Sequence, residues 1–139
     1  MDRQLLQAAE KGDAASQFNL GVLYTNDFDD NHHPVVGNRA EAMRWLLAAA
    51  EQGLPRAQIR LAEIYAEAPD IAESQVKACG WYLLAAASLR GVHLHRARTG
   101  YERVCLHLTP GQIEQVRRFA RDWKPIGPNQ GVTGTRRRA

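Results

Sequence analysis

The chain has 139 residues, of which 45% are hydrophobic and 24% charged, as in an ordinary globular protein and unlike a disordered segment. No run of about 18 or more apolar residues occurs, so we expect no membrane-spanning helix. The net charge of +3 is unevenly distributed, with −6 over residues 1–75, +5 over residues 76–123 and +4 over residues 124–139. The charges therefore form a dipole along the sequence.

The first ten residues do not resemble a secretory signal, because their apolar element is short and Glu10 follows it closely. We expect a cytoplasmic protein, or a periplasmic one if an export signal has been removed. The segment Leu5–Lys11 predicts the end of a helix that stops at Gly12. Residues 1–12 are therefore interpreted as a partial repeat unit.

An internal repeat follows this segment. The first copy runs from Gly12 to Tyr24 and, after a loop, from Ala42 to Gly53; the second occupies 53–65 and 78–87. Corresponding residues are 41 positions apart in three pairs, which are Gly12 with Gly53, Leu20 with Leu61 and Tyr24 with Tyr65. The two tryptophans, Trp45 and Trp81, are 36 positions apart. The shorter step arises in the linking loop, where insertions cost little.

Each repeat reads as a pair of helices. Gln17, Leu20, Gly21 and Tyr24 have the offsets 0, 3, 4 and 7 of one helical face. Small residues in this pattern allow two helix backbones to approach closely, while a tyrosine and a tryptophan fill the wider parts of the layer. Glycines at 12, 53 and 91 suit left-handed helix ends, and Pro55 suits a first helical turn.

The pattern Ala-Gln-x-x-Leu-Gly-x-x-Tyr followed by Ala-x-x-Trp-x-x-x-Ala-Ala-x-x-Gly resembles the Sel-one-like repeat, a relative of the tetratricopeptide repeat. The resemblance covers residues 13–91, with Ser16 and Ala62 as departures and a longer, more acidic loop at 26–38. It implies an all-α fold, an α-solenoid of antiparallel helix pairs with about seven helices. It also implies a non-catalytic module or adaptor for protein–protein interaction.

Residues 92–123 are interpreted as a degenerate capping repeat. Thr109 and Pro110 predict an N-cap and the first position of a final helix, a start that resembles the terminal helix of many bacterial members of the family. The expected organisation is one helical-repeat domain over 1–123, with repeats at 13–53 and 54–91. The Pro-, Gly- and Arg-rich residues 124–139 are expected to form a disordered basic tail.

Neither the cysteines nor the histidines suggest a special chemistry. Cys79 and Cys105 lack metal-ligand or redox spacing, and we interpret them as free, buried thiols in a reducing compartment. The acidic loop Asp27–His33 lacks the glycine and closing glutamate of an EF-hand. His93 and His95 are two apart, which is the wrong spacing for one helical face. We therefore expect no metal and no cofactor.

No catalytic residue is proposed from the sequence. None of the three serines, Ser16, Ser74 and Ser88, lies in a Gly-x-Ser-x-Gly elbow. No Ser-x-x-Lys motif and no phosphate-binding glycine-rich loop occurs either. We expect that the protein is not an enzyme, and we keep a hydrolase only as the last of the alternatives.

Stacked helix pairs leave a concave groove lined by the first helix of each pair. We expect this groove to hold a peptide or helix of another protein, with Asn19 as the strongest candidate, because its amide can both donate to and accept from a bound backbone. The predicted groove residues are Asn19, Val22, Leu23, Asn26, Arg60, Glu63, Ile64 and Glu67. The predicted structural core comprises Leu20, Tyr24, Trp45, Leu61, Tyr65 and Trp81.

The basic second half leaves an alternative open. An acidic partner or a nucleic acid could dock there, although the acidic first half and the lack of a known motif argue against nucleic acid. Salt-dependent pairing of two copies, acidic half to basic half, is a further possibility. The predicted basic face comprises Arg96, Arg98, Arg103, Arg117 and Arg121.

Overall fold

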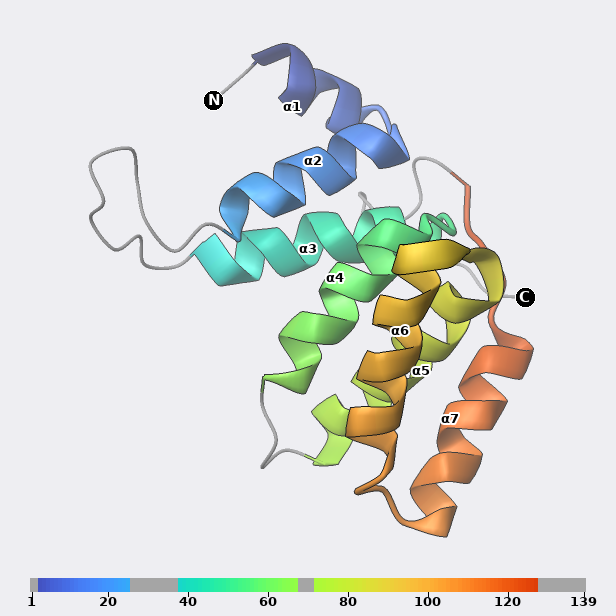
Figure 1. Cartoon of the computed structure of the whole chain (residues 1–139). Coiled ribbons are helices and arrows are strands. Elements are labelled where there is room, and N and C mark those ends of the chain that lie inside the picture. The colour runs from blue at the N-terminus through green and yellow to red at the C-terminus, as the bar shows by residue number, and fades with distance from the viewer. Residues whose placement is uncertain (1–2, 26–37, 68–71, 128–139) are drawn as a thin grey trace. The chain divides into compact units, whose positions relative to one another are not determined.

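A computed structural model describes residues 3–25, 38–67 and 72–127 of the chain. The described residues contain helices and no strand, which confirms the predicted all-α fold class of paired helices (Figure 1). The helices are α1 (Arg3–Glu10), α2 (Ala14–Tyr24), α3 (Asn38–Glu51), α4 (Pro55–Ala66), α5 (Ala72–Ser88), α6 (Gly91–Cys105) and α7 (Pro110–Asp122). The expected acidic loop at 26–38 falls almost entirely outside the described residues, as does most of the expected tail.

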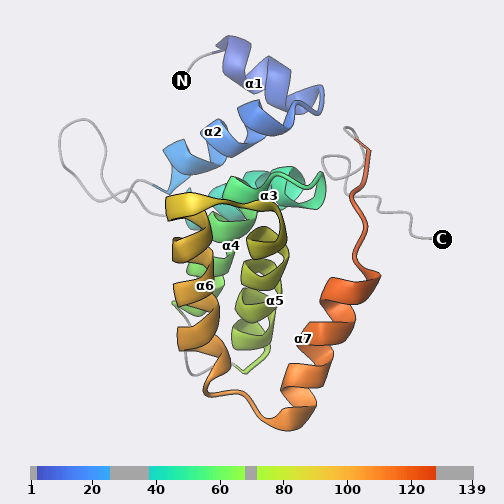
Figure 2. The same ribbon diagram turned by 45° about the vertical axis from the view of Figure 1, so that its right-hand side comes forward.

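The chain divides into two compact units, which are described separately below. One comprises Met1–Leu54 with Pro125–Ala139, and the other comprises Pro55–Lys124. The first contains α1, α2 and α3, and the second contains α4 to α7 (Figure 2).

Two glycines end helices in the first unit by the same local mechanism. Gly12 and Gly53 have φ values of 101° and 97°, a left-handed conformation that glycine adopts without a Cβ clash. The Gly12 N–H donates to the Ala9 carbonyl at 3.0 Å, and the Asp13 N–H donates to the Ala8 carbonyl at 3.1 Å. This pair of bonds is the Schellman motif, and the bonds after α3 repeat it. The equivalent glycines of the repeat therefore have equivalent structures.

The first unit is held together by close helix packing around a small apolar cluster. Ala9, Leu20 and Trp45 form its buried centre, and Leu5, Leu6 and Tyr24 pack against them. A Cβ added to Gly21 would lie 2.7 Å from Leu46 Cγ, so any larger residue at this position would force Leu46 of α3 to shift. The small residues of the repeat pattern thus allow α2 and α3 to approach closely.

A buried polar contact links the three helices of this unit. The Gln17 side chain is fully buried, and its Nε2 donates to the Ala9 carbonyl at 3.0 Å. Its Oε1 accepts from Gln52 Nε2 at 2.8 Å, and the same Gln52 nitrogen lies 2.9 Å from the Gly12 carbonyl. Buried amides must be paired in this way, since an unpaired one costs about 1–3 kcal/mol.

In the second unit, α5 packs against α4, α6 and α7. Two glycines permit the close approach of neighbouring aromatic rings: Gly80 of α5 lies beneath Phe119 of α7, and Gly100 of α6 lies against the Tyr82 ring. The Trp81 ring meets Phe119 edge-on, with centroids 5.3 Å apart. This glycine–aromatic packing positions α6 and α7 on α5.

The prediction of free thiols was wrong. Cys79 of α5 and Cys105 of α6 form a disulfide, with a Cα–Cα distance of 5.8 Å, inside the usual range for such bonds. Both cysteines are buried. Their sequence positions carried no recognisable motif, because the bond depends on how α5 and α6 pack.

The final helix begins as its sequence predicted. The Gln112 N–H donates to Thr109 Oγ1 at 3.2 Å, and the Thr109 N–H donates to Gln112 Oε1 at 2.8 Å. With Pro110 at the first helical position, these bonds form a complete capping box. The start of α7 is therefore specified locally.

Candidate protein-binding surfaces

The first helix of each repeat has one exposed face. On α2, Ala15, Asn19 and Leu23 are exposed at intervals of four residues, and Leu23 retains 48% of its surface. Val22 is half-buried beside them, and Asn26 lies outside the described residues. The exposed face of α2 thus carries an amide and an uncovered leucine.

The corresponding residues of α4 are more enclosed. Arg60, Glu63 and Ile64 are half-buried, and Glu67 at the end of the helix is exposed. Glu63 accepts two bonds from the Arg96 guanidinium of α6, at 2.9 Å to Nε and 2.6 Å to Nη2. Arg60 approaches the same carboxylate at 3.9 Å. The structure therefore joins two predicted groove residues to one residue of the predicted basic face.

The tandem aromatic and aliphatic positions differ in burial. Leu20 and Leu61 have no exposed surface, and Trp45 and Trp81 retain 2% and 5%. Tyr24 and Tyr65 are half-buried. The latter ring lies 5.5 Å from the ammonium of Lys77, a distance at which a cation and a ring attract each other.

A buried phenol adjoins the Arg96 ion pair. Burial raises the pKa of Tyr82 above its ordinary 10.0, and the nearby Glu63 carboxylate raises it further. Arg103 opposes this shift through its charge and a hydrogen bond to the phenol. The Tyr82 phenol is thus held in its neutral form, while its ring packs on Gly100.

The residues of the predicted basic face do not share one environment. Arg96 is bound to Glu63, and Arg121 lies 3.3 Å from Asp122. Arg117 is exposed on α7, and Arg103 contacts Tyr82. Arg98 lines a pocket, which was not predicted from the sequence.

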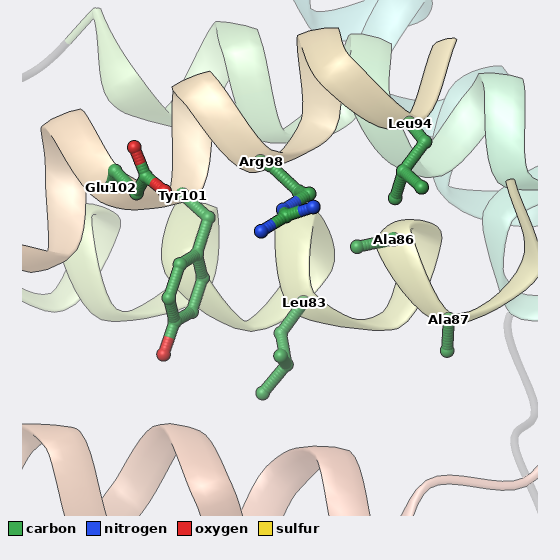
Figure 3. A pocket seen from close by; sticks show the side chains of 7 residues that line it. All are labelled: Leu83, Ala86, Ala87, Leu94, Arg98, Tyr101 and Glu102. Atoms are coloured by element: carbon green, nitrogen blue, oxygen red, sulfur yellow. The ribbon is translucent and has the colours of Figure 1, made fainter. Parts of the chain in front are cut away.

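This pocket has a volume of about 460 Å³ and lies along α5 and α6 (Figure 3). Sequence reasoning identified only Arg98 among its residues. The spacing of Leu94, Arg98 and Tyr101 was a signal for a shared helical face, but nothing indicated that α5 would lie opposite. The lining residues are Leu83, Ala86, Ala87, Leu94, Arg98, Tyr101 and Glu102.

The candidate metal ligands show no clustering where the structure describes them. Within 3–25, 38–67 and 72–127, no three His, Cys, Asp or Glu residues are grouped to hold a metal ion. His93 and His95 are exposed on α6. The acidic loop Asp27–His33 lies outside these ranges.

The paired helices, the left-handed glycines between them and the repeated tyrosine and tryptophan positions define a helical repeat protein. The Sel1 repeat model matches residues 14–54 and 55–88, so the chain belongs to the Sel1 repeat family. The matched ranges contain α2 with α3 and α4 with α5. Comparison with curated proteins and with solved structures found no match.

Sel1 repeats are generally protein–protein interaction modules, and their helical fold is typically a non-catalytic scaffold. None of the described helices has the length and apolar character needed to cross a bilayer. The general class of activity therefore follows from the family, and the particular partner does not.

Proposed function

We propose that this protein is a non-catalytic adaptor that binds a peptide or helix of another protein through the exposed faces of its first repeat helices. The observation that carries the proposal is the exposed face of α2. Asn19 offers an amide that can donate and accept, and Leu23 offers uncovered apolar surface one turn away. The amide suits hydrogen bonding to a partner's backbone, and the leucine suits contact with an apolar residue of the partner.

The α4 face contributes differently to the proposed function. Because Glu63 is already bound to Arg96, its carboxylate is oriented before a partner arrives. An oriented side chain loses less conformational freedom on binding than a mobile one. We expect Ile64 and Glu67 to supply direct contacts, and the Arg60–Glu63–Arg96 cluster to position charge.

The experiment is a pull-down with the immobilised full chain, followed by mass spectrometry. The test variant combines Asn19→Ala with Leu23→Glu. The control is Ala40→Glu, which adds the same charge at an exposed position of α3. We expect a protein that the native chain and Ala40→Glu retain and the double variant loses, with the helical circular dichroism of all three alike. Equal retention by all three, or retention of nucleic acid alone, would refute the proposal.

The disulfide indicates in which compartment the protein acts. Disulfides persist in oxidising compartments and are rare in a reducing cytosol, so the buried Cys79–Cys105 bond favours the periplasmic alternative over the cytoplasmic one. The test is alkylation of the protein in intact source cells before lysis, followed by mass spectrometry. Two unmodified, disulfide-linked cysteines are expected, whereas two alkylated thiols would place the protein in a reducing compartment.

A further inference from the structure

The pocket along α5 and α6 combines an apolar floor with a single cation. Leu83, Ala86 and Ala87 of α5 line it together with Leu94 of α6. The Ala86 and Leu94 side chains point toward each other, and the Arg98 guanidinium lies between Leu94 and Tyr101 (Figure 3). An apolar surface with a few polar or charged groups, here including Arg98 and Glu102, is typical of a binding site. The pocket lies within the second compact unit, whereas α2 belongs to the first.

Arg98 brings a positive charge to the pocket. Arg96 and Arg121 have carboxylate partners, but no ion pair of Arg98 occurs in the part of the chain that the structure describes, although Glu102 lies one helical turn away. The second unit as a whole has eleven Lys and Arg against seven Asp and Glu, a net charge of +4. A partner segment that meets this surface is therefore favoured if it carries carboxylates.

The size of the pocket sets how much of a partner it takes. An enclosed cavity of about 150 Å³ already holds a benzene ring, so a pocket of about 460 Å³ has room for two aliphatic side chains. The residues from Leu94 to Glu102 cover about 12 Å of α6, at about 1.5 Å per residue. Two side chains two helical turns apart, about 11 Å along the axis of a partner helix, match this length.

The backbone chemistry of the pocket favours a helix over an extended peptide. The lining residues lie inside α5 and α6, where backbone N–H and C=O groups are bonded within their own helix. An extended partner would bring backbone groups that find few partners here, whereas a helix satisfies its own. Recognition of this kind uses apolar anchors at helical spacing.

We propose that the α5–α6 pocket docks an acidic amphipathic helix of a partner protein, with two aliphatic side chains against Leu83, Ala86 and Leu94 and a carboxylate paired with Arg98. This rests on the interaction role proposed above and assigns a second surface to it. Glu102 sets a further condition, since a carboxylate beside it would be repelled. The charge of the partner helix must therefore lie toward Arg98.

The experiment selects partners from a displayed library of helical 14-residue peptides, which carry glutamates on the polar face and randomised aliphatic residues on the other. The full native chain is the bait. Ala86→Trp fills the pocket and should weaken the selected peptides at least about tenfold, since burial of one aliphatic side chain is lost. Arg98→Glu should weaken them about fivefold or more, and exchange of one peptide glutamate for arginine should restore binding.

Matched controls separate the pocket from general effects. Arg118→Glu makes the same charge change on the side of α7 opposite the buried Val116. Ala40→Trp adds the same ring at an exposed position of α3. Both should leave binding unchanged. Equal loss with Arg98→Glu and Arg118→Glu, or insensitivity to Ala86→Trp, would overturn the proposal.

The outcomes also separate this proposal from the preceding one. Peptides that ignore the pocket variants but are lost with Asn19→Ala and Leu23→Glu would refute the pocket and support the α2 face. A library that yields no binder would overturn the pocket proposal alone, because the α2 face is tested by the pull-down. Association of the native chain with itself in sedimentation, abolished by Ala86→Trp, would replace the partner helix with a second copy.

Discussion

Removal of the disulfide should have a large and calculable effect on stability. The bond joins Cys79 to Cys105 across a sequence separation of 26 residues. For a loop of this length, the chain-entropy relation states that the bond lowers the conformational entropy of the unfolded chain by about 12 cal/mol/K. This corresponds to about 3.5 kcal/mol of stability at about 298 K. The free energy of unfolding should fall by about this amount on reduction, because the unfolded chain regains its freedom.

The assay is urea denaturation of the native chain with and without a phosphine reductant, followed by circular dichroism. With a denaturant slope of about 1–3 kcal/mol/M, the midpoint should fall by about 1–3 M. The Cys79→Ala/Cys105→Ala variant is the control, and its midpoint should not respond to the reductant. An unchanged midpoint for the native chain, with two free thiols verified by alkylation, would refute the reasoning.

Three further predictions concern packing, capping and pH. Gly21→Ala should destabilise the chain by about 1–3 kcal/mol, because the new Cβ would lie 2.7 Å from Leu46; urea denaturation measures this. Thr109→Ala should cost about 1 kcal/mol by removing the N-cap of α7, measured in the same way. The folded-state pKa of Tyr82 is raised above its ordinary 10.0. The neutral phenol therefore stabilises the fold fully below about pH 10, and this stabilisation is lost as the pH rises through the folded-state pKa, because the unfolded chain loses the phenol proton first. Denaturation over a pH series should show this loss in the native chain and a smaller one in Tyr82→Phe.

Each of the two stability predictions has a control in the same chain. A Cβ at Gly111 would meet nothing closer than 3.9 Å, so Gly111→Ala should be neutral or slightly stabilising. Thr99 is exposed in the middle of α6, so Thr99→Ala removes the same side chain without removing a cap. A loss at Gly111 equal to that at Gly21, or at Thr99 equal to that at Thr109, would contradict the assigned mechanisms. For pH, an identical alkaline loss in Tyr82→Phe would exclude Tyr82 as its source.

The predictions from sequence succeeded where the structure depends on near neighbours. The repeated glycines predicted helix ends, and Gly12 and Gly53 have the left-handed φ values of such ends. Gly91, predicted in the same way, also has a positive φ but is the first residue of α6. Thr109 and Pro110 predicted the start of α7, which has a complete capping box. In each case the relevant hydrogen bonds span at most five residues, so the local sequence is sufficient.

The same reasoning failed or was silent where distant segments meet. Cys79 and Cys105 were interpreted as free thiols, although their helices bring them together. Arg96 was assigned to a basic face, but it binds Glu63, which is 33 residues away. No periodicity within α6 could indicate which residues of α5 would complete the pocket around Arg98.

The sequence by itself determined the helices, their ends and their repeated pairing, because helical periodicity and capping act over one or two turns. The tertiary structure alone decided which thiols are bonded, that Arg96 pairs with Glu63, and where the apolar pocket that contains Arg98 lies. These features join residues of different helices. Their distances are set by how side chains such as Tyr82 and Gly100 interlock, which no single helix specifies.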